Sequence, residues 1–560
     1  MKSKTISVEH RNSDPTINLV LDTIVMKKQC IVFVNTKRSA ESIAEKIAEF
    51  ILKDKKHDYK SLIDEKKLSE ISGDIFHALA SPTRQCMRLA EAAKYGAVFH
   101  HSGLVAEQRS IIENNFRDGI IKVIVATPTL SMGIDLPAFR VIIRDLKRYG
   151  VWGMQYIPVL EYEQQAGRAG RPSYDSYGEA ICITDDDSEK IEIKERYING
   201  VPEEITSKLA VEPIMRTYIL SLIASEFIRT TKELREFFSK TFYARHYGDM
   251  GKLNLIIDRM LDQLEAWEFI EYESEGDVEK KSDAKKTIGK GLRIDFVSAI
   301  KLSFANDRKI RATMLGRRVS ELYLDPYTAN HIIISLKVGI KKKDEELFNS
   351  FSIVHLATTC LELRPLLRVK SKELNDFGEE LLKKQDFMLT EVPELFDEDY
   401  DEFLNSLKTS MLFSEWLDEH DEEYLMERFD VRPGELRGKL ELIDWLMYSM
   451  EELSKLLKMH TLVKDVSKTR FRLKYGVKEE LIPLLQLRNI GRVRARKMFN
   501  AGIKDIGSVK RVDITTLTQL LGKNIALDVK KQVGQELSEE KVKVPENKRK
   551  GQKNLGDYDE

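Results

Sequence analysis

Two arginines in the segment EYEQQAGRAGRPSYDSYGEAICI (161–183) have the spacing that most clearly indicates chemistry. Arg168 and Arg171 stand in a G-R-x-G-R frame just ahead of a short strand-like run, EAICI. Arginines in such a frame usually stabilise charge on a phosphoryl group, whose transfer depends on charge stabilisation rather than on covalent chemistry. The segment therefore predicts one side of a nucleotide-hydrolysing site.

Further candidate residues follow other strand-like runs. They are Thr36 to Arg38, His101 to Gly103, Thr127 to Thr129, Gly133 and Asp135. Each position alone is weak evidence, because a glycine after a strand is commonly a turn and A-T-P-T can merely cap a helix. Their order along the chain is what makes them specific.

The elements that must position these residues alternate between strands and helices. The predicted strands are 30–35, 97–101, 122–127, 140–145 and 179–183, and helical apolar periods cover 37–50 and 105–119. This alternation predicts a parallel α/β domain whose site lies at the carboxyl ends of the strands.

Four motifs in this domain resemble those of superfamily 2 helicases. FVNTKRSAE, HHSGL, ATPTLSMGIDLPA and QQAGRAGR match motifs IV, IVa, V and VI in that order. VIIRDLKRYG, IPVLEY, AGRAGRPSYD and GEAI further resemble the archaeal Hjm-type, Ski-like DNA helicases. The resemblance runs almost to the C-terminus.

The predicted fold is multidomain. A RecA-like α/β motor domain (1–204) is followed by a winged helix (205–325), a helical ratchet bundle (326–460) and a helix–hairpin–helix domain (461–534). The polar tail (535–560) is predicted to be disordered. The winged helix could either contact DNA or serve as a spacer, since no base-reading residues are evident in it.

The resemblance also implies roles for individual residues, with ATP and Mg²⁺ as cofactors. Arg168 and Arg171 would reach the γ-phosphate, and Gln164 would order the attacking water. The implied nucleotide-binding residues are Gly133, Asp135, Gly167 and Gly170. The implied nucleic-acid contacts in this domain are Thr36, Lys37, His101, Thr127 and Thr129.

A glycine-rich phosphate loop and a magnesium-binding carboxylate pair are not found in the sequence. No G-x-x-x-x-G-K-[ST] occurs, and Asp418-Glu419-His420 lies in an acidic helical stretch rather than after a buried strand. We therefore expect the magnesium ligands to come from an N-terminal RecA-like motor domain, in cis or in trans. We expect the chain alone to be inactive as an ATPase.

Glycines and aromatic residues between motifs V and VI predict a β-hairpin. The segment RDLKRYGVWGMQYIPVLEY has Gly150 and Gly153 at a turn, flanked by Tyr149, Trp152 and Tyr156. The resemblance places the strand-separating hairpin here, although ordinary packing would also explain the aromatic residues.

The helix GELRGKLELIDWLMYSMEELSKLL (434–457) has an apolar stripe of Leu436, Leu440, Ile443, Met447, Met450 and Leu453. Trp445 falls roughly opposite the stripe, with Arg437 on its polar side. Trp445 could pack on a second helix or stack on a base. The resemblance favours stacking.

Residues 484–512 are basic and match a helix–hairpin–helix pattern. Asn489 stands where a turn requires a left-handed conformation, which asparagine tolerates. Arg494, Arg496 and Lys497 are the predicted phosphate contacts, and R-A-R at 494–496 resembles the family's autoinhibitory tip. A merely solvated basic face is the alternative.

Composition limits the classes of function. The 560 residues predict several domains, and a net charge of −1 requires local basic patches for nucleic-acid binding. Four isolated cysteines and the lack of a membrane-spanning apolar run predict a cytoplasmic protein with no membrane partner.

The expected function is that of the C-terminal portion of an ATP-dependent 3′–5′ DNA helicase. It would act on single-stranded and forked or branched DNA in replication-linked repair. The alternatives are an RNA helicase of the same branch and a non-catalytic DNA-binding subunit that needs a partner motor domain.

Overall fold

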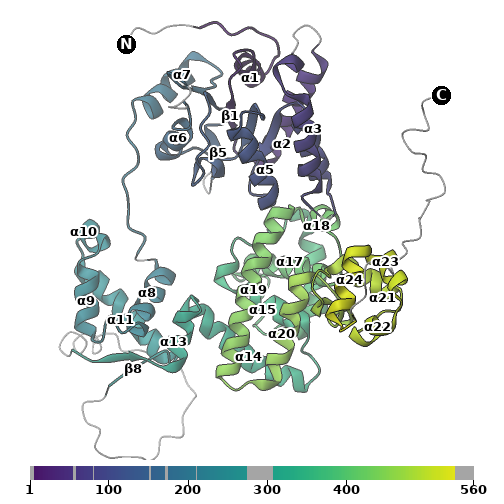
Figure 1. The fold of residues 1–560 in the computed structure, drawn as a ribbon. Helices are drawn as coiled ribbons and strands as arrows, with labels where there is room; N and C mark the ends of the chain where they lie inside the picture. Colours follow the sequence, from purple (N-terminus) through teal and green to yellow (C-terminus); the bar gives the residue numbers. More distant parts are fainter. Residues whose placement is uncertain are drawn as a thin grey trace, which may run out of the picture. The chain divides into compact units, whose positions relative to one another are not determined.

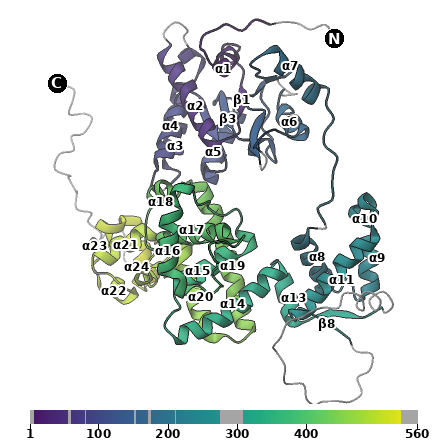
Figure 2. The same cartoon turned by 180° about the vertical axis from the view of Figure 1, so that it is seen from behind.

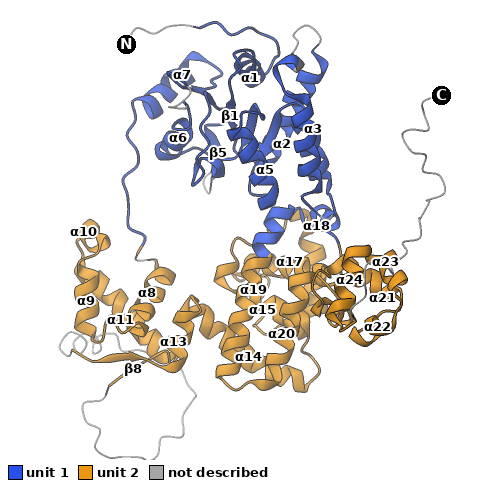
Figure 3. Ribbon diagram, in the orientation of Figure 1, with its two compact units in different colours: residues 1–208, 421–439 blue, residues 209–420, 440–560 orange. Residues whose placement is uncertain are grey.

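The computed structural model describes residues 6–54, 59–79, 81–150, 153–170, 175–209, 211–273 and 307–535. The chain divides into two compact units, coloured in Figure 3. The first comprises residues 1–208 with 421–439, and the second comprises residues 209–420 with 440–560. The first unit thus includes a short segment from within the predicted helical bundle.

A five-stranded parallel sheet forms the centre of the first unit. Its order is β2-β3-β1-β4-β7, with every neighbouring pair parallel. The strands are β1 (Cys30–Phe33), β2 (Ala97–His100), β3 (Val123–Ala126), β4 (Arg140–Ile143) and β7 (Glu179–Cys182). Strands β1 to β4 are buried along their whole length, as their continuous apolar runs require. All five predicted strands and the parallel arrangement are confirmed.

Helices cover this sheet (Figures 1 and 2). Helix α2 packs against β2 and β3, α1 against β1 and β4, and α6 against β4. The helices are α1 (Pro15–Val25), α2 (Lys37–Lys53), α3 (Glu65–His77), α4 (Arg84–Ala93), α5 (Ala106–Arg117), α6 (Val159–Ala166) and α7 (Asp187–Ile193). The two predicted helices, 37–50 and 105–119, correspond to α2 and α5.

The predicted hairpin forms a separate two-stranded antiparallel sheet. Strand β5 (Lys147–Gly150) pairs with β6 (Gly153–Tyr156), so that Lys147 faces Tyr156 and Gly150 faces Gly153. Gly153 has a φ of +98°, a conformation that favours glycine. The turn glycines therefore set the position of this hairpin.

The second unit begins with a small mixed region. Its helices are α8 (Glu212–Ala224), α9 (Thr231–Ser239), α10 (Phe242–Tyr247), α11 (Met250–Ala266) and α13 (Met314–Glu321). Strands β8 (Ile270–Tyr272) and β9 (Ile310–Ala312) form an antiparallel ribbon. A buried bidentate ion pair between Arg216 and Asp325 ties α8 to the start of the next helix.

The rest of the second unit is helical. A first group comprises α14 (Pro326–Asp344), α15 (Ser350–Thr359), α16 (Leu374–Lys384), α17 (Tyr400–Leu417), α19 (Pro433–Leu456) and α20 (His460–Tyr475). A second comprises α21 (Arg492–Asn500), α22 (Ile506–Arg511), α23 (Ile514–Leu521) and α24 (Lys523–Gln532), which share a core of their own. Helices α18 (Glu422–Phe429) and the first residues of α19 belong to the first unit.

The apolar stripe of α19 is buried as predicted. Leu436, Ile443, Met447, Met450 and Leu453 are core residues, and Leu440 packs at the core's edge. No helix in the described part of the chain is both long enough and apolar enough to cross a bilayer.

Candidate nucleotide and nucleic-acid site

Motifs V and VI are joined by main-chain hydrogen bonds. The amide of Ala138 donates to the carbonyl of Arg168 (2.9 Å), and the amide of Gly170 donates to the carbonyl of Ala138 (2.7 Å). Gly170 has a φ of +93° and lies against Gly178, where a side chain on either residue would crowd the backbone. The glycines of motif VI thus allow its loop to lie directly beside motif V.

This contact fixes the side chain of Arg168. Its Nη2 donates to the carbonyl of Ser131 (2.5 Å), and its Nη1 lies 3.8 Å from Asp135 Oδ1. The Asp135 side chain is 95% exposed, so it remains accessible to a ligand. The structure therefore brings Arg168 and Asp135 together, whereas Arg171 lies outside the described residues.

Gln164 and Gly133 fit a nucleotide-hydrolysing cleft. The Oε1 atom of Gln164 is buried and has no hydrogen-bond partner among the described residues. A buried acceptor of this kind is commonly satisfied by an ordered water molecule, which suits the predicted role of Gln164 in ordering water. Gly133, on the motif V loop, has a φ of +77° and open space where a side chain would be. Among the described residues, no cluster of three His, Cys, Asp or Glu side chains could hold a metal.

The motif IV and V threonines lie at the carboxyl ends of β1 and β3. Thr36 is exposed and caps α2, because its Oγ1 accepts from the amide of Ser39 (3.0 Å). The hydroxyls of Thr127 and Thr129 are 3.0 Å apart, and Thr129 is exposed. Gly167 ends α6. These placements leave the predicted phosphate contacts open to test.

The prediction that His101 contacts nucleic acid directly is wrong. Its side chain is completely buried, with 0% exposure, and stacks on Phe99. Its Nδ1 accepts from the amide of Gly103 (3.1 Å), and its Nε2 lies 3.2 Å from Glu41 Oε1 at a poor hydrogen-bond angle. Burial lowers the pKa of His101, so the ring is neutral at pH 7. Its role is to support the interior.

Glu41 was not predicted as a site residue, yet it is the centre of an ion-pair cluster. Its side chain is only 6% exposed and accepts from Arg432 Nε (2.9 Å) and Arg88 Nη1 (2.8 Å). Burial alone would raise its pKa, but contacts with His101 and Arg432 outweigh burial and lower the pKa to about 2. Its position at the border of the apolar stripe of α2 is the signal that could have identified it. Lys37 is also engaged, in an ion pair with Glu435.

The β5–β6 hairpin, predicted to separate strands, exposes one of its aromatic residues. Tyr149 is 82% exposed. Tyr156 is packed instead, with Lys147 Nζ 4.6 Å and Arg196 Cζ 4.4 Å from its ring centroid, and its hydroxyl donates to Glu192. Trp152 lies outside the described residues. Of the two predicted hairpin aromatic residues that the structure describes, Tyr149 is therefore the exposed one.

Trp445 is half-buried rather than free of the core. It packs against the main core of the second unit, and its indole N–H donates to the carbonyl of Leu322 (3.0 Å). The packing and this hydrogen bond tie the indole to its neighbours, so Trp445 contributes to stability, and base stacking stays a prediction. Arg437 is exposed, with Glu422 3.8 Å away.

The basic segment near residue 490 is only partly open. Asn489 has the predicted left-handed conformation, with a φ of +64°. Arg494 is exposed and donates to the carbonyl of Asn489, and Lys497 is exposed. Arg496 is instead paired with Glu419 (2.8 Å) and Glu480 (3.0 Å), so a phosphate would have to compete with two carboxylates for it. Glu419 follows the end of α17, which agrees with its exclusion from a D-E-x-H box.

Comparison with known proteins gives two family matches. Residues 74–173 match the helicase conserved C-terminal domain, and residues 351–476 match domain 4 of archaeal helicases. The first covers the region of motifs IVa to VI, and the second covers most of the helical part of the second unit.

Three similar proteins carry the name ATP-dependent DNA helicase Hel308. The chain is 36% identical to that of Methanococcus vannielii over 521 residues, which cover 91% of this chain and 66% of that protein. It is 33% identical to that of Methanocella arvoryzae, over 100% of this chain and 70% of that protein. It is 36% identical to that of Pyrococcus abyssi, over 95% of this chain and 67% of that protein. The chain thus spans about two thirds of the length of these relatives.

Proposed function

Because the chain belongs to the Hel308 family of ATP-dependent DNA helicases, we propose that it supplies one half of an ATP-driven motor together with its DNA-binding domains. The observation that carries this proposal is the meeting of motifs V and VI, which holds Arg168 beside Asp135. Gln164, on the helix that leads into motif VI, has a buried side-chain oxygen without a partner among the described residues. Arginine and glutamine in these positions suit phosphoryl transfer to water.

The proposed mechanism assigns a separate task to each residue. ATP with Mg²⁺, when bound, supplies the phosphoryl group whose transfer to water releases free energy. Arg168, joined by Arg171, stabilises the negative charge that develops on this group. Gln164 orients the water through its side-chain oxygen. Gly133 and Asp135 of the motif V loop line the nucleotide together with Gly167 and Gly170 of motif VI.

The domains beyond the motor would hold the DNA. We assign residues 205–325 as a winged helix, 326–460 as a ratchet bundle and 461–534 as a helix–hairpin–helix domain. The four helices α8 to α11, the antiparallel β8–β9 ribbon and the left-handed Asn489 before α21 support these assignments. In this proposal the protein is of the Hjm type, tracks one strand in the 3′–5′ sense and opens forked DNA in the cytoplasm during repair.

The phosphate loop and the magnesium carboxylates would come from a further RecA-like domain. The 560 residues contain no G-x-x-x-x-G-K-[ST] sequence. We therefore propose that the arginine side described here pairs with a domain that carries that loop, in cis or in trans. The chain by itself would bind DNA without hydrolysing ATP.

The test combines the purified chain with the first RecA-like domain of a relative, supplied in trans. We expect DNA-stimulated ATP hydrolysis, which Arg168→Ala lowers by about 10³-fold or more, the loss typical of an arginine that stabilises phosphoryl transfer. Arg117→Ala, an exposed arginine at the end of α5, is the matched control and should change nothing.

Two results would contradict the proposal. ATP hydrolysis by the chain alone that is unaffected by Arg168→Ala would show that the site lies elsewhere. Stimulation by single-stranded RNA but not by DNA would place the chain on the RNA branch of the superfamily.

A further inference from the structure

Residues 430–435 are attached to the motor domain by both main-chain and side-chain contacts. They meet two segments, Lys37–Glu41 at the start of α2 and the loop His101–Leu104 after β2. We call this contact the α19 joint, because Pro433 begins α19. All of its residues lie in the first unit, although α19 continues into the second.

A pair of glycines brings the two backbones together. The amide of Gly434 donates to the carbonyl of Gly103 (3.0 Å). A Cβ atom on Gly434 would lie 2.3 Å from the carbonyl oxygen of Leu104 and 2.7 Å from that of Ser102. Since backbone atoms cannot rotate away, no other residue fits at position 434 without displacing the loop. This contact is therefore stiff.

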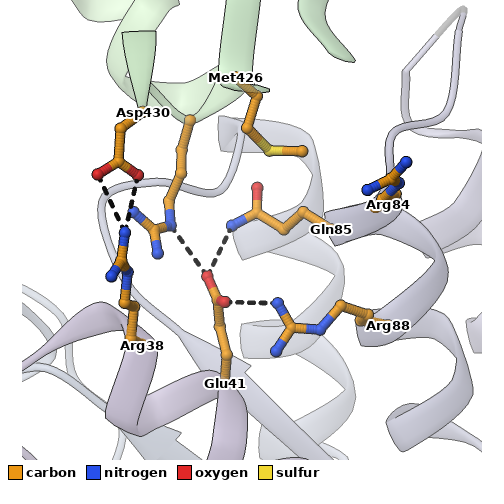
Figure 4. A pocket seen from close by; sticks show the side chains of 8 residues that line it. Arg38, Glu41, Arg84, Gln85, Arg88, Met426 and Asp430 are labelled. Carbon is orange, nitrogen blue, oxygen red and sulfur yellow. Dashed lines mark hydrogen bonds and ion pairs between the residues drawn. The ribbon is translucent and has the colours of Figure 1, made fainter. Parts of the chain in front are cut away.

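A charge cluster centred on the buried Glu41 (Figure 4) lies beside Gly103, which Arg432 approaches closely. Glu41 receives hydrogen bonds from Arg432 on one side and from Arg88 and Gln85 of α4 on the other. Because Glu41 is shielded from water, withdrawal of Arg432 would leave a buried carboxylate short of a partner. The cluster therefore opposes separation of the two segments.

Further ion pairs surround this centre at the surface. Arg38 Nη2 donates to both carboxylate oxygens of Asp430, at 3.0 and 3.1 Å, and Lys37 pairs with Glu435. Arg84 contacts both Glu423 and Glu427 of α18. Exposed pairs of this kind contribute little stability but fix the register of a contact.

We propose that the α19 joint couples the motor domain to the DNA-binding helix, so that nucleotide-driven movement of the sheet carries the start of α19 with it. The loop His101–Leu104 follows β2, and β2 pairs with β3, whose end carries Thr127 of motif V. Arg437 and Trp445, the candidate DNA contacts, lie further along α19. Glu41, Arg432 and Gly434 are thus positioning residues. This inference rests on the function proposed above.

The sharpest test is a pair of alanine substitutions one helical turn apart. Gly434→Ala must push the loop away, whereas Gly438→Ala meets nothing within 4 Å and serves as the matched control. In the enzyme completed in trans, we expect Gly434→Ala to retain DNA-stimulated ATP hydrolysis. The base pairs opened per ATP should fall by about 2- to 30-fold, the usual range for a coupling residue. Gly438→Ala should keep the wild-type ratio.

A second measurement uses the chain alone and does not depend on ATP. Amide hydrogen exchange in peptides covering 97–105 and 421–439 should become faster in Gly434→Ala and stay unchanged in Gly438→Ala. Arg432→Gln, which leaves the backbone contact intact, provides a milder variant if Gly434→Ala fails to fold.

The outcomes separate this inference from the proposed function. If the wild-type assembly does not hydrolyse ATP, the proposed function fails. Faster amide exchange in Gly434→Ala would in that case show only that the α19 joint holds the two segments together. If hydrolysis is normal and both Gly434→Ala and Arg432→Gln unwind DNA with the wild-type ratio, the joint does not transmit movement and the inference is overturned.

Discussion

Replacing Glu41 with glutamine should destabilise the first unit in a pH-dependent way. The carboxylate has an ordinary pKa of 4.5, which its contacts lower to about 2 in the folded chain. A group with a depressed folded pKa stabilises the fold above its unfolded pKa, and this contribution is lost as the pH falls towards the folded value. The relevant window is therefore between about pH 4.5 and about pH 2.

The magnitude follows from the size of the shift. At about 1.4 kcal/mol per pKa unit, the ionised carboxylate contributes on the order of 3 kcal/mol at neutral pH. Glutamine has nearly the same shape but no charge, so Glu41→Gln should lose most of this free energy. For a unit of this size, that loss lowers the melting temperature by about 6–12 °C. The assay is thermal unfolding of both proteins at a series of pH values from 7 to 3.

The difference between the two proteins should shrink as the pH falls, because the wild type loses its ionised carboxylate while the variant has none. Glu45→Gln is the matched control. Like Glu41, Glu45 lies on α2 and pairs with Arg88 of α4, but its side chain is 36% exposed. Its effect should be at most about 1 kcal/mol. A melting difference for Glu41→Gln that is the same at pH 7 and pH 3 would refute this reasoning.

Three further predictions concern the DNA-binding parts. Deleting Gly150 to Gly153 in the completed enzyme should abolish unwinding and leave ATP hydrolysis largely intact, whereas equal loss of both would mean that the hairpin only supports the domain. Trp445→Ala should weaken single-strand binding by about 1–3 kcal/mol and also lower the melting temperature, because the bond to the Leu322 carbonyl is lost; an unchanged melting curve would contradict the observed packing. Arg494→Ala should flatten the slope of log affinity against log salt by about 0.7 for single strands, while Arg496→Ala should leave this slope unchanged and reduce thermal stability. Equal slopes for Arg494→Ala and the wild type in a salt titration would remove Arg494 from the DNA path.

The strands and the motif order of the first unit could be predicted because their signals are local. Each strand is a short apolar run bounded by polar or glycine residues, and parallel strands buried on both faces need such runs. The hairpin was equally accessible, since Gly150 and Gly153 mark its turn. The stripe of α19 followed from its period of 3.6 residues.

The partners of charged residues could not be predicted, because they depend on segments far apart in the chain. His101 is separated by 60 residues from Glu41 in sequence, and Arg432 by 391. Nothing near Arg496 indicates that Glu419 neutralises it. A helical wheel puts Trp445 opposite the stripe, but it does not show that the ring packs against the core or that the Leu322 carbonyl accepts from its indole.

The return of residues 421–439 to the first unit has a consequence for synthesis on the ribosome. Residues 1–208 emerge first, yet Glu41 and the loop after β2 lack Arg432 and Gly434 until residue 439 has been made. At about 5–20 residues per second, translation of the intervening segment takes on the order of 10–50 s. During that interval the nascent motor domain lacks the contacts that cover the Glu41 carboxylate and the loop after β2 in the folded chain. Slow codons between 209 and 420 would lengthen this exposure, whereas supplying 421–439 as a fused segment after residue 208 would remove it.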